Sequence, residues 1–337
     1  MASTEEKTEE TLGYFERPKI CARFKYGSHK ESTLLEFEGV DQCNGSMLIE
    51  ALRGIGTTST VVGAHLIGTL KLQCVAVFVS PSLPAMTSVH KFMPTSAIRI
   101  YGNKEMCVAI SDYALHSTDR CDIVWQICQS VMEFAQRHKC KHIISVDGFP
   151  VTGGVQQQIE SMAKQHMKQQ QKLQNHSAAE DDDEDKEKEK ETEPAADPFA
   201  VAHYLSTDKS IAEKLKQSGH EGIKTMQIMG ATGAMMQMAF CGAFYGDAEE
   251  DNQADVPFSA LLAPDPVSIP DRRGALLAIR LLREVWGLHE IDVESLQQDA
   301  ARLQEKVQQT VSEIATQMQA QRRIQMQAQR PPQHMYV

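Results

Sequence analysis

From about residue 46, short apolar runs alternate with segments in which apolar residues recur every three or four positions. Runs such as "CVAVFVS" and "HIISVDGFP" predict buried strands, and "AIRIYGN" with "MCVAISD" predicts a hairpin around "GNK". Residues 119–138 and 271–286 predict helices with one buried face, the second ending at Gly287. Strands that alternate with helices predict an α/β sheet covered on both faces.

The segment "RGIGTTSTVVG" joins a predicted strand to a predicted helix over 57–70, for which Thr57 or Thr58 is available as the cap. Position 59 is Ser59, so the glycines do not match the GxGxxG dinucleotide fingerprint, and no Lys follows at P-loop spacing. Tight turns and close packing explain these glycines better than a nucleotide site. Farther along, "GIKTMQIMG" is predicted to be a strand, and the Met-rich helix after it to be a core helix rather than a partner surface.

Charge is distributed unevenly over the 337 residues. The net charge is -11, and Glu180–Glu193 contains ten acidic residues and three Lys, a net of -7. This composition predicts a disordered insert at about 156–196. No basic face remains for nucleic acid. The polar, acidic start and the lack of a long apolar stretch favour a cytoplasmic protein, nuclear also being possible, without a membrane partner.

Candidate chemistry is sparse in this chain. The eight cysteines contain no CxxC pair, and they are expected to be free thiols, mostly buried. "HKCKH" alternates His138, Cys140 and His142 but has no further ligands nearby, so no metal or cofactor is expected. Asp147 and Asp265 follow predicted strands, where α/β active sites form, yet each lies beside Gly or Pro, where Asp caps turns. No nucleophile, base and oxyanion-donor set can be assembled, so we expect no catalytic residue and no enzyme.

The C-terminal part, from residue 292, is mostly polar and has a narrower apolar pattern than the preceding segments. From residue 292 to 324 apolar residues keep three-and-four spacing on an otherwise polar helix, which predicts a coiled coil that holds a homo-oligomer together. Packing against its own domain is the alternative. The predicted seam contains Leu296, Leu303, Val307 and Ile314. Residues 325–337 are expected to be a flexible tail, which places Met335, Tyr336 and Val337 at its tip.

Several segments together resemble the proteasome assembly chaperones, in particular the archaeal-type members. They are "LIEALRGIGTTSTVVGAHLI", "SPSLP" with "AIRIYGN", "ISVDGFP", "IMGATGA" and "LLAPDPVSIPDRRGALLAIRLLREVWGLHEID", in this order and spacing. The resemblance covers roughly Met47 to Asp292 and implies a three-layer α/β/α sandwich resembling the nucleoside phosphorylase-like fold, without known catalysis. It also implies binding to the proteasome core particle α subunits through a C-terminal hydrophobic-Tyr-any tripeptide, which Met335, Tyr336 and Val337 match.

The resemblance divides the chain into an N-terminal extension (1–45), an α/β domain (46–290), the coiled-coil helix (292–324) and the docking tail (325–337). The extension and the acidic insert depart from the family pattern. Whether such a protein chaperones assembly or caps mature core particles is left open by the sequence. Two other functions remain as alternatives: a nucleoside-phosphorylase-like enzyme, since fold likeness alone is a weak guide to activity, or a coiled-coil scaffold unrelated to the proteasome.

Overall fold

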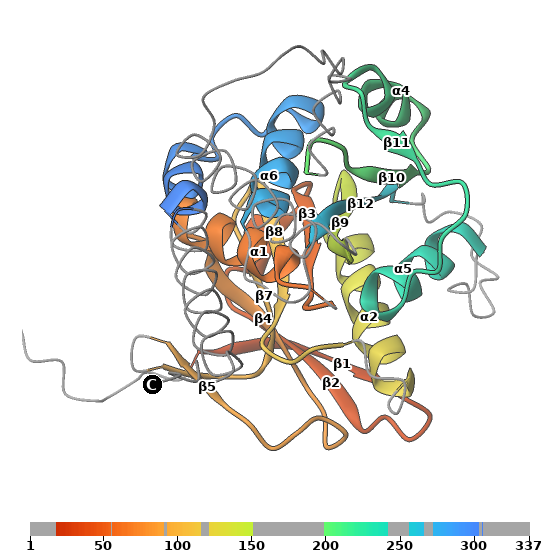
Figure 1. Cartoon of the computed structure of the whole chain (residues 1–337). Coiled ribbons are helices and arrows are strands. Elements are labelled where there is room, and N and C mark those ends of the chain that lie inside the picture. The colour runs from red at the N-terminus through yellow and green to blue at the C-terminus, as the bar shows by residue number, and fades with distance from the viewer. Residues whose placement is uncertain are drawn as a thin grey trace, which may run out of the picture.

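The computed structural model describes residues 18–54, 56–90, 93–115, 121–150, 199–241, 256–265, 272–302 and 305. Within these ranges, ten strands form one sheet in the order β1-β2-β4-β7-β8-β3-β9-β12-β10-β11, and β5 and β6 form a separate pair (Figure 1). The strands are β1 Ile20–Tyr26, β2 Ser32–Phe37, β3 Met47–Ala51, β4 Gln73–Val79, β5 Ser88–His90, β6 Met93–Thr95, β7 Ile98–Gly102, β8 Met106–Ser111, β9 His142–Pro150, β10 His203–Ser206, β11 Glu221–Gly222 and β12 Phe258–Asp265.

The centre of the sheet is parallel and its flanks are antiparallel. Strands β8, β3, β9 and β12 run in the same direction. On one side of them β7, β4, β2 and β1 follow with alternating direction, and on the other side β10 pairs antiparallel with β12. The predicted hairpin is confirmed, because β7 pairs antiparallel with β8.

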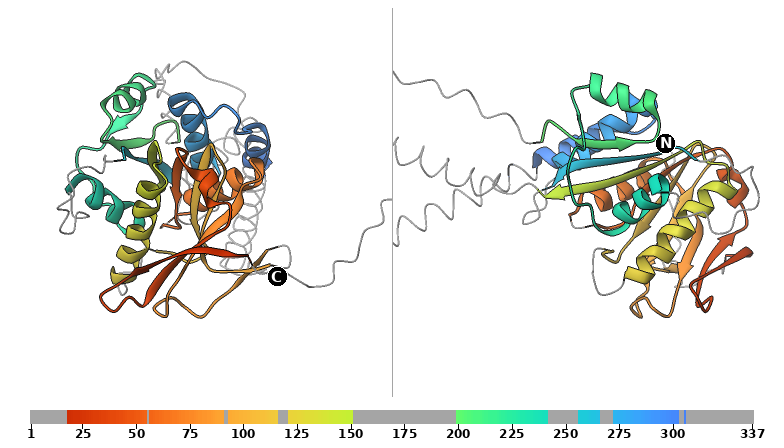
Figure 2. Two further views of the ribbon diagram at one scale, coloured as in Figure 1. Left: turned by 180° about the vertical axis from the view of Figure 1, so that it is seen from behind. Right: turned by 90° about the vertical axis from the view of Figure 1, so that its right-hand side faces the viewer.

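Helices cover both faces of this sheet, as the alternating pattern predicts. They are α1 Thr58–Thr69, α2 Cys121–Arg137, α4 Lys209–Gln217, α5 Gly230–Cys241 and α6 Arg273–Trp286, with the short 3-10 helix η1 at Val40–Cys43. Helix α1 contacts α6, and α2 contacts α5. In the right-hand view of Figure 2, α4 and α6 lie on one side of β9 and β12, and α5 lies on the other.

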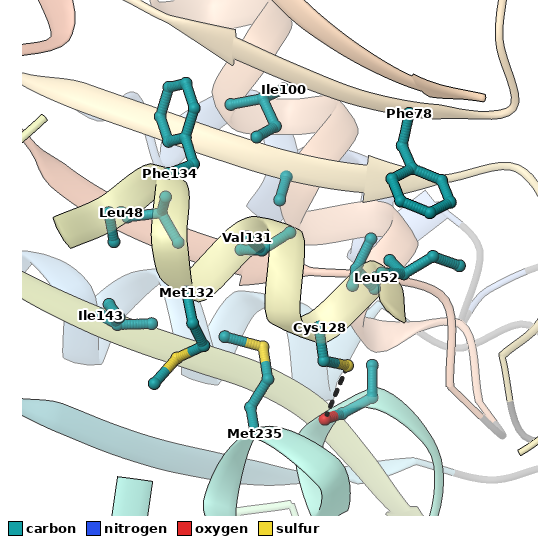
Figure 3. Close-up of a cluster of buried hydrophobic side chains, with 14 of the residues drawn as sticks. Leu48, Leu52, Phe78, Ile100, Cys128, Val131, Met132, Phe134, Ile143 and Met235 are labelled. Atoms are coloured by element: carbon teal, nitrogen blue, oxygen red, sulfur yellow. Dashed lines mark hydrogen bonds between the residues drawn. The ribbon is translucent and has the colours of Figure 1, made fainter. Parts of the chain in front are cut away.

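Successive residues of the central strands point into two separate hydrophobic cores. Leu48 packs with α2 and α5, whereas the next residue, Ile49, packs with α1 and α6. Because both faces of the central strands are covered, most of their residues are apolar. Figure 3 shows the first core, where Phe134 and Met235 from two helices meet side chains of the sheet.

Two expectations about the strands are wrong. Residues 20–37 are not an extension, since β1 and β2 belong to the sheet and Leu34 is buried under α2. The segment "GIKTMQIMG" is not a strand. Its partner, β10, has only four residues and pairs with β11 at two positions, while Met226 and Met229 beyond them are exposed. The Met-rich helix that follows is a core helix as expected, with Met235 fully buried.

The α6 C-terminus is confirmed as the sequence predicts. Gly287 has a φ of 73°, in the left-handed region, and its backbone N–H donates to the Leu282 carbonyl. No helix in the part of the chain that the structure describes is long and apolar enough to cross a bilayer.

The helix after α6 begins at Glu294, and its first turns pack on their own domain. Leu296 is 3% exposed and belongs to the core formed by α1, α4 and α6. Asp299 forms an ion pair with Arg272, and Gln297 accepts a hydrogen bond from Arg280 at 3.4 Å. The assignment of Leu296 to an oligomer seam is therefore wrong, because its side chain is already buried within one copy.

The rest of the predicted seam, Leu303, Val307 and Ile314, lies outside the described residues, as do the acidic insert and the tail with Met335, Tyr336 and Val337. The coiled coil and the phosphorylase-like character of the fold stay predictions.

A buried carboxyl cluster at the ends of the parallel strands

Three carboxyl groups gather where the parallel strands end. Glu50 comes from β3, Asp147 from β9 and Asp265 from the last position of β12. The exposed fractions of these three residues are 0%, 6% and 2%. In open α/β sheets this edge is where ligands bind, so the cluster is the first place to look for chemistry.

Glu50 and Asp147 are joined by two hydroxyl groups. The Ser145 Oγ lies within hydrogen-bond distance of Glu50 Oε2 and is 3.0 Å from Thr232 Oγ1, which donates to Asp147 Oδ2 at 3.2 Å. The remaining oxygens accept from backbone amides, Glu50 Oε1 from Leu52 at 2.8 Å and Asp147 Oδ1 from Gly148 at 2.7 Å. This chain of contacts connects β3 to β9 and to the first turn of α5.

Asp265 caps α1 from more than two hundred residues away. Its Oδ2 accepts from the backbone amides of Thr57 and Thr58, at 2.7 and 2.8 Å, and from the Thr58 hydroxyl at 2.8 Å. Thr57 is the N-cap residue of α1, one of the two positions that the sequence offers, but its side chain makes no capping hydrogen bond and Asp265 takes that role. A carboxylate at this position occupies the helix terminus at which an α/β enzyme would hold a phosphate or another anion.

The glycines of "RGIG" are present because these carboxyl groups approach the backbone closely. A Cβ on Gly54 would overlap Asp147, and a Cβ on Gly56 would overlap Asp265. Gly63, one turn into α1, lies against Ile110 of β8 in the same way. The close-packing interpretation of the glycines is confirmed.

Burial changes the protonation of two members of the cluster. It raises the pKa of Glu50 to about 8, against the opposing hydrogen bond from Ser145. Burial also raises the pKa of Asp147 to about 7, and the nearby Asp265 charge adds to this shift. At neutral pH Glu50 is therefore mostly a neutral acid, which can donate to Ser145 and continue the chain of hydrogen bonds toward Asp147.

The stability of the protein is expected to depend on pH through Glu50. An unfolded Glu titrates near 4, so the unfolded state loses this proton first and the stability contribution of neutral Glu50 falls as pH rises from about 4 to about 8. Glu50→Gln removes that titration. The difference in unfolding free energy between the variant and the natural protein should therefore rise, in favour of the variant, by on the order of a few kcal/mol from pH 4 to pH 8. Urea denaturation at each pH measures this difference.

Comparing the variant with the natural protein separates the pH dependence due to Glu50 from that due to His142, which has the opposite sign. Burial lowers the pKa of His142 to about 4, so its contribution to stability falls as pH drops below about 6.5 in both proteins and cancels in the difference. Glu38→Gln, at an exposed carboxylate, is the matched control and should leave the pH profile unchanged. A Glu50→Gln profile parallel to that of the natural protein would contradict a neutral buried Glu50.

The residues of "HKCKH" have separate partners. His138 contacts Asn44 at 3.0 Å and Glu36 at 3.3 Å, while His142 contacts the Ser259 hydroxyl at 2.8 Å. Among the residues that the structure describes, no group of three or more His, Cys, Asp and Glu side chains could hold a metal ion. Cys43, Cys107, Cys128 and Cys140 are buried thiols outside any disulfide, Cys74 is a half-buried one, and Cys21 is an exposed one.

Sequence reasoning singled out Asp147 and Asp265 as turn caps at strand ends, and the structure brings these two residues to one place. It missed Glu50, Ser145 and Thr232. The available signal was Glu50 itself, because it interrupts the apolar strand "MLIEA" with a charge that must be buried if the strand is central.

A family model described as the PAC2 family matches residues 48–311 of this chain. A comparison with curated proteins gives no significant match. Among solved structures, the chain is similar to Pyrococcus furiosus PbaA, an archaeal homolog of proteasome-assembly chaperone, with a TM-score of 0.56, 18% identity, and coverage of 88% of this chain and 97% of that one.

Two further structures have the same fold. Pyrococcus furiosus PbaB, an archaeal proteasome activator, has a TM-score of 0.57 and 18% identity, covering 83% of this chain and 98% of that one. A Thermoplasma acidophilum protein of unknown function has a TM-score of 0.52 and 15% identity, covering 83% and 90%. The resemblance to the proteasome assembly chaperones is confirmed at the level of family and fold: the chain belongs to the PAC2 family.

Proposed function

We propose that this protein is a proteasome assembly chaperone or core-particle-binding factor that docks on the α-subunit ring through its C-terminal Met335, Tyr336 and Val337. The observation that carries the proposal is the family membership, together with the fold shared with one homolog of a proteasome-assembly chaperone and one proteasome activator. The tripeptide is a match in sequence to the docking motif of such chaperones.

The buried cluster supports a binding protein over a phosphorylase. Asp265 occupies the N-terminus of α1, where an enzyme of this architecture would bind phosphate, and its oxygen is held by Thr57 and Thr58. The hydroxyls that could serve a reaction, on Ser145 and Thr232, are committed to the carboxyl groups of Glu50 and Asp147. The hydrogen bonds of the cluster thus have a structural role: they join α1 and α5 to the parallel strands.

The tail would work through burial and charge. A Tyr ring and a Met side chain that enter a pocket between two α subunits bury apolar area, and the terminal carboxylate can meet a Lys in that pocket. One such contact is weak after the cost of ordering the tail. When one tail of a homo-oligomer is bound, the effective concentration of its other tails near the neighbouring pockets is high. The overall affinity of the oligomer then exceeds that of a single tail. A cytoplasmic or nuclear location, where core particles assemble, is part of this proposal.

Capture of purified proteasome core particles tests the proposal. The immobilised full chain should retain core particles, and a chain that lacks residues 335–337 should not, with equal folding of the two checked by circular dichroism. Retention by both proteins would move the contact to the α/β domain. No retention by either, with phosphorolysis of a nucleoside in the presence of phosphate, would favour the enzyme alternative.

A further inference from the structure

A large groove runs along the outer side of α1, and most of its lining is apolar. Its floor contains Val77, Tyr101 and Ile110, which belong to β4, β7 and β8. Ala64 is an exposed small residue on the α1 wall, and Val89 of β5 is 69% exposed. The volume of the groove is about 1170 Å³. Sites for small molecules typically have about 300–1,000 Å³, so this groove suits a segment of polypeptide better.

The described structure begins at one end of this groove. Pro18 is the first described residue, and it lines the groove. The carbonyl of the next residue, Lys19, accepts a hydrogen bond from the Glu38 amide at 2.9 Å, so Pro18 lies beside the end of β2. Because β2 and β4 are antiparallel, the end of β2 lies next to the start of β4 at Gln73. The residues that precede Pro18 are therefore attached where the floor of the groove begins.

The groove is short enough for a few residues to fill it. From Gln73 to Val77 its floor follows β4 for four residues, about 13 Å at 3.3 Å per residue. Its α1 wall from Thr60 to Gly68 extends for eight residues, about 12 Å at 1.5 Å per residue. Seven residues in an extended conformation reach about 23 Å. Residues 11–17 are therefore sufficient to run the length of the groove from their attachment at its end.

Residues 11–17 also have a composition that fits an apolar groove. They read "TLGYFER" and include Leu12, Tyr14 and Phe15, whereas residues 3–10 are only Ser, Thr, Glu and Lys. Tyr and Phe bury a large apolar area and have few side-chain torsions to fix, so they are effective anchors. The apolar residues of this N-terminal part are thus concentrated in the positions that reach the groove.

The charges of the groove agree with this segment. Two charged lining residues, Arg99 and Asp112, are joined to each other at 2.8 Å between Nη2 and Oδ1. A third, Lys71, is exposed, lies two positions before the floor begins and has no ion-pair partner among the described residues. Glu16 stands two positions before Pro18 in the sequence, which brings a negative charge within reach of Lys71 at this end of the groove.

We propose that the groove beside α1 binds residues 11–17 of the same chain, with Tyr14 and Phe15 on its apolar floor and Glu16 near Lys71. Because the segment is attached at Pro18, its effective concentration at the groove is high, which favours it over a second copy or a free peptide. The contact shields the groove from other partners until the segment leaves. It depends neither on core-particle binding nor on the oligomeric state.

Photo-crosslinking of the full chain tests the contact directly. Benzoylphenylalanine replaces Tyr14 in ¹⁵N-labelled protein, which is unfolded, mixed with an excess of unlabelled natural protein and refolded. We expect crosslinks within the labelled copy on the tryptic peptides 54–71 and 72–91, which contain the α1 wall and the β4 floor. Crosslinks to the unlabelled copy, or crosslinks only outside these two peptides, would overturn the proposal.

A variant that fills the groove provides an independent measurement by limited proteolysis. Chymotrypsin cleaves after aromatic residues, and a docked segment is cut only while it is open. Ala64→Trp places a large ring on the exposed α1 wall and should speed cleavage after Tyr14 and Phe15 by roughly tenfold, followed by mass spectrometry. Lys214→Trp, on the exposed face of α4, is the matched control and should leave this rate unchanged, with folding of both variants checked by circular dichroism. Equal cleavage rates for the natural protein and Ala64→Trp would sink the proposal.

Discussion

Tyr336→Ala is expected to abolish most binding to proteasome core particles while folding and oligomeric mass stay unchanged. An aromatic anchor in a pocket typically accounts for about 2–4 kcal/mol of binding free energy, which is roughly 30- to 1,000-fold in affinity for each tail. In the proposed homo-oligomer several tails would bind together, so the losses would multiply in its avidity. The measurement is the dissociation rate of the oligomer from immobilised core particles.

Two further changes at the tip act as controls for the mechanism. One residue added after Val337 moves the carboxylate away from its expected Lys and should be as damaging as the loss of the ring. Val337→Ala keeps the carboxylate and should have a mild effect, since the motif accepts any residue at that position. If Tyr336→Ala dissociates as slowly as the natural protein, the tripeptide has no role in docking.

Asp265→Ala is expected to destabilise the α/β domain by about 3–5 kcal/mol. The substitution removes one carboxylate oxygen that accepts from two backbone amides and a hydroxyl, and it leaves these donors at the buried start of α1 without partners. A change of this size is a large part of the roughly 5–15 kcal/mol that holds a typical domain folded. The midpoint of urea unfolding measures it.

The control is a second capping aspartate, Asp208, which is only half-buried and caps its own, adjoining helix. Asp208 caps α4 through the backbone amides of Ser210, at 2.8 Å, and Ile211, at 3.4 Å. Asp208→Ala should cost about 1 kcal/mol, as helix caps at the surface do. Equal losses of unfolding free energy for the two substitutions would contradict the conclusion that Asp265 stabilises the tertiary structure by capping a helix that is distant in sequence.

The sequence predicted the elements that carry a strong local signal. Helix α2 was predictable because its apolar residues recur on one face, and β9 because an apolar run ends in Gly and Pro. The end of α6 at Gly287 follows from the left-handed backbone that glycine adopts at low cost. Order and spacing of weak motifs were enough to identify the family, which the family model confirms.

Errors arose where pairing and packing partners are far apart in the sequence. Residues 20–37 are strands only because β4 offers a free edge to β2, and residues 223–230 are not a strand because β10 is too short to pair with them. Leu296 belongs to an apolar stripe that fits either a partner helix or its own domain, and only the position of α6 assigns it to the core.

By itself, therefore, the sequence determined the α/β class and the family, because the alternation of apolar runs and the order and spacing of the motifs can be read along the chain. Only the tertiary structure decided what Asp147 and Asp265 do. A carboxylate beside a glycine has the same local sequence whether it binds a ligand or caps a helix. The outcome depends on which backbone amides the fold brings within about 3 Å of it, and for Asp265 those amides come from Thr57 and Thr58 at the other end of the domain.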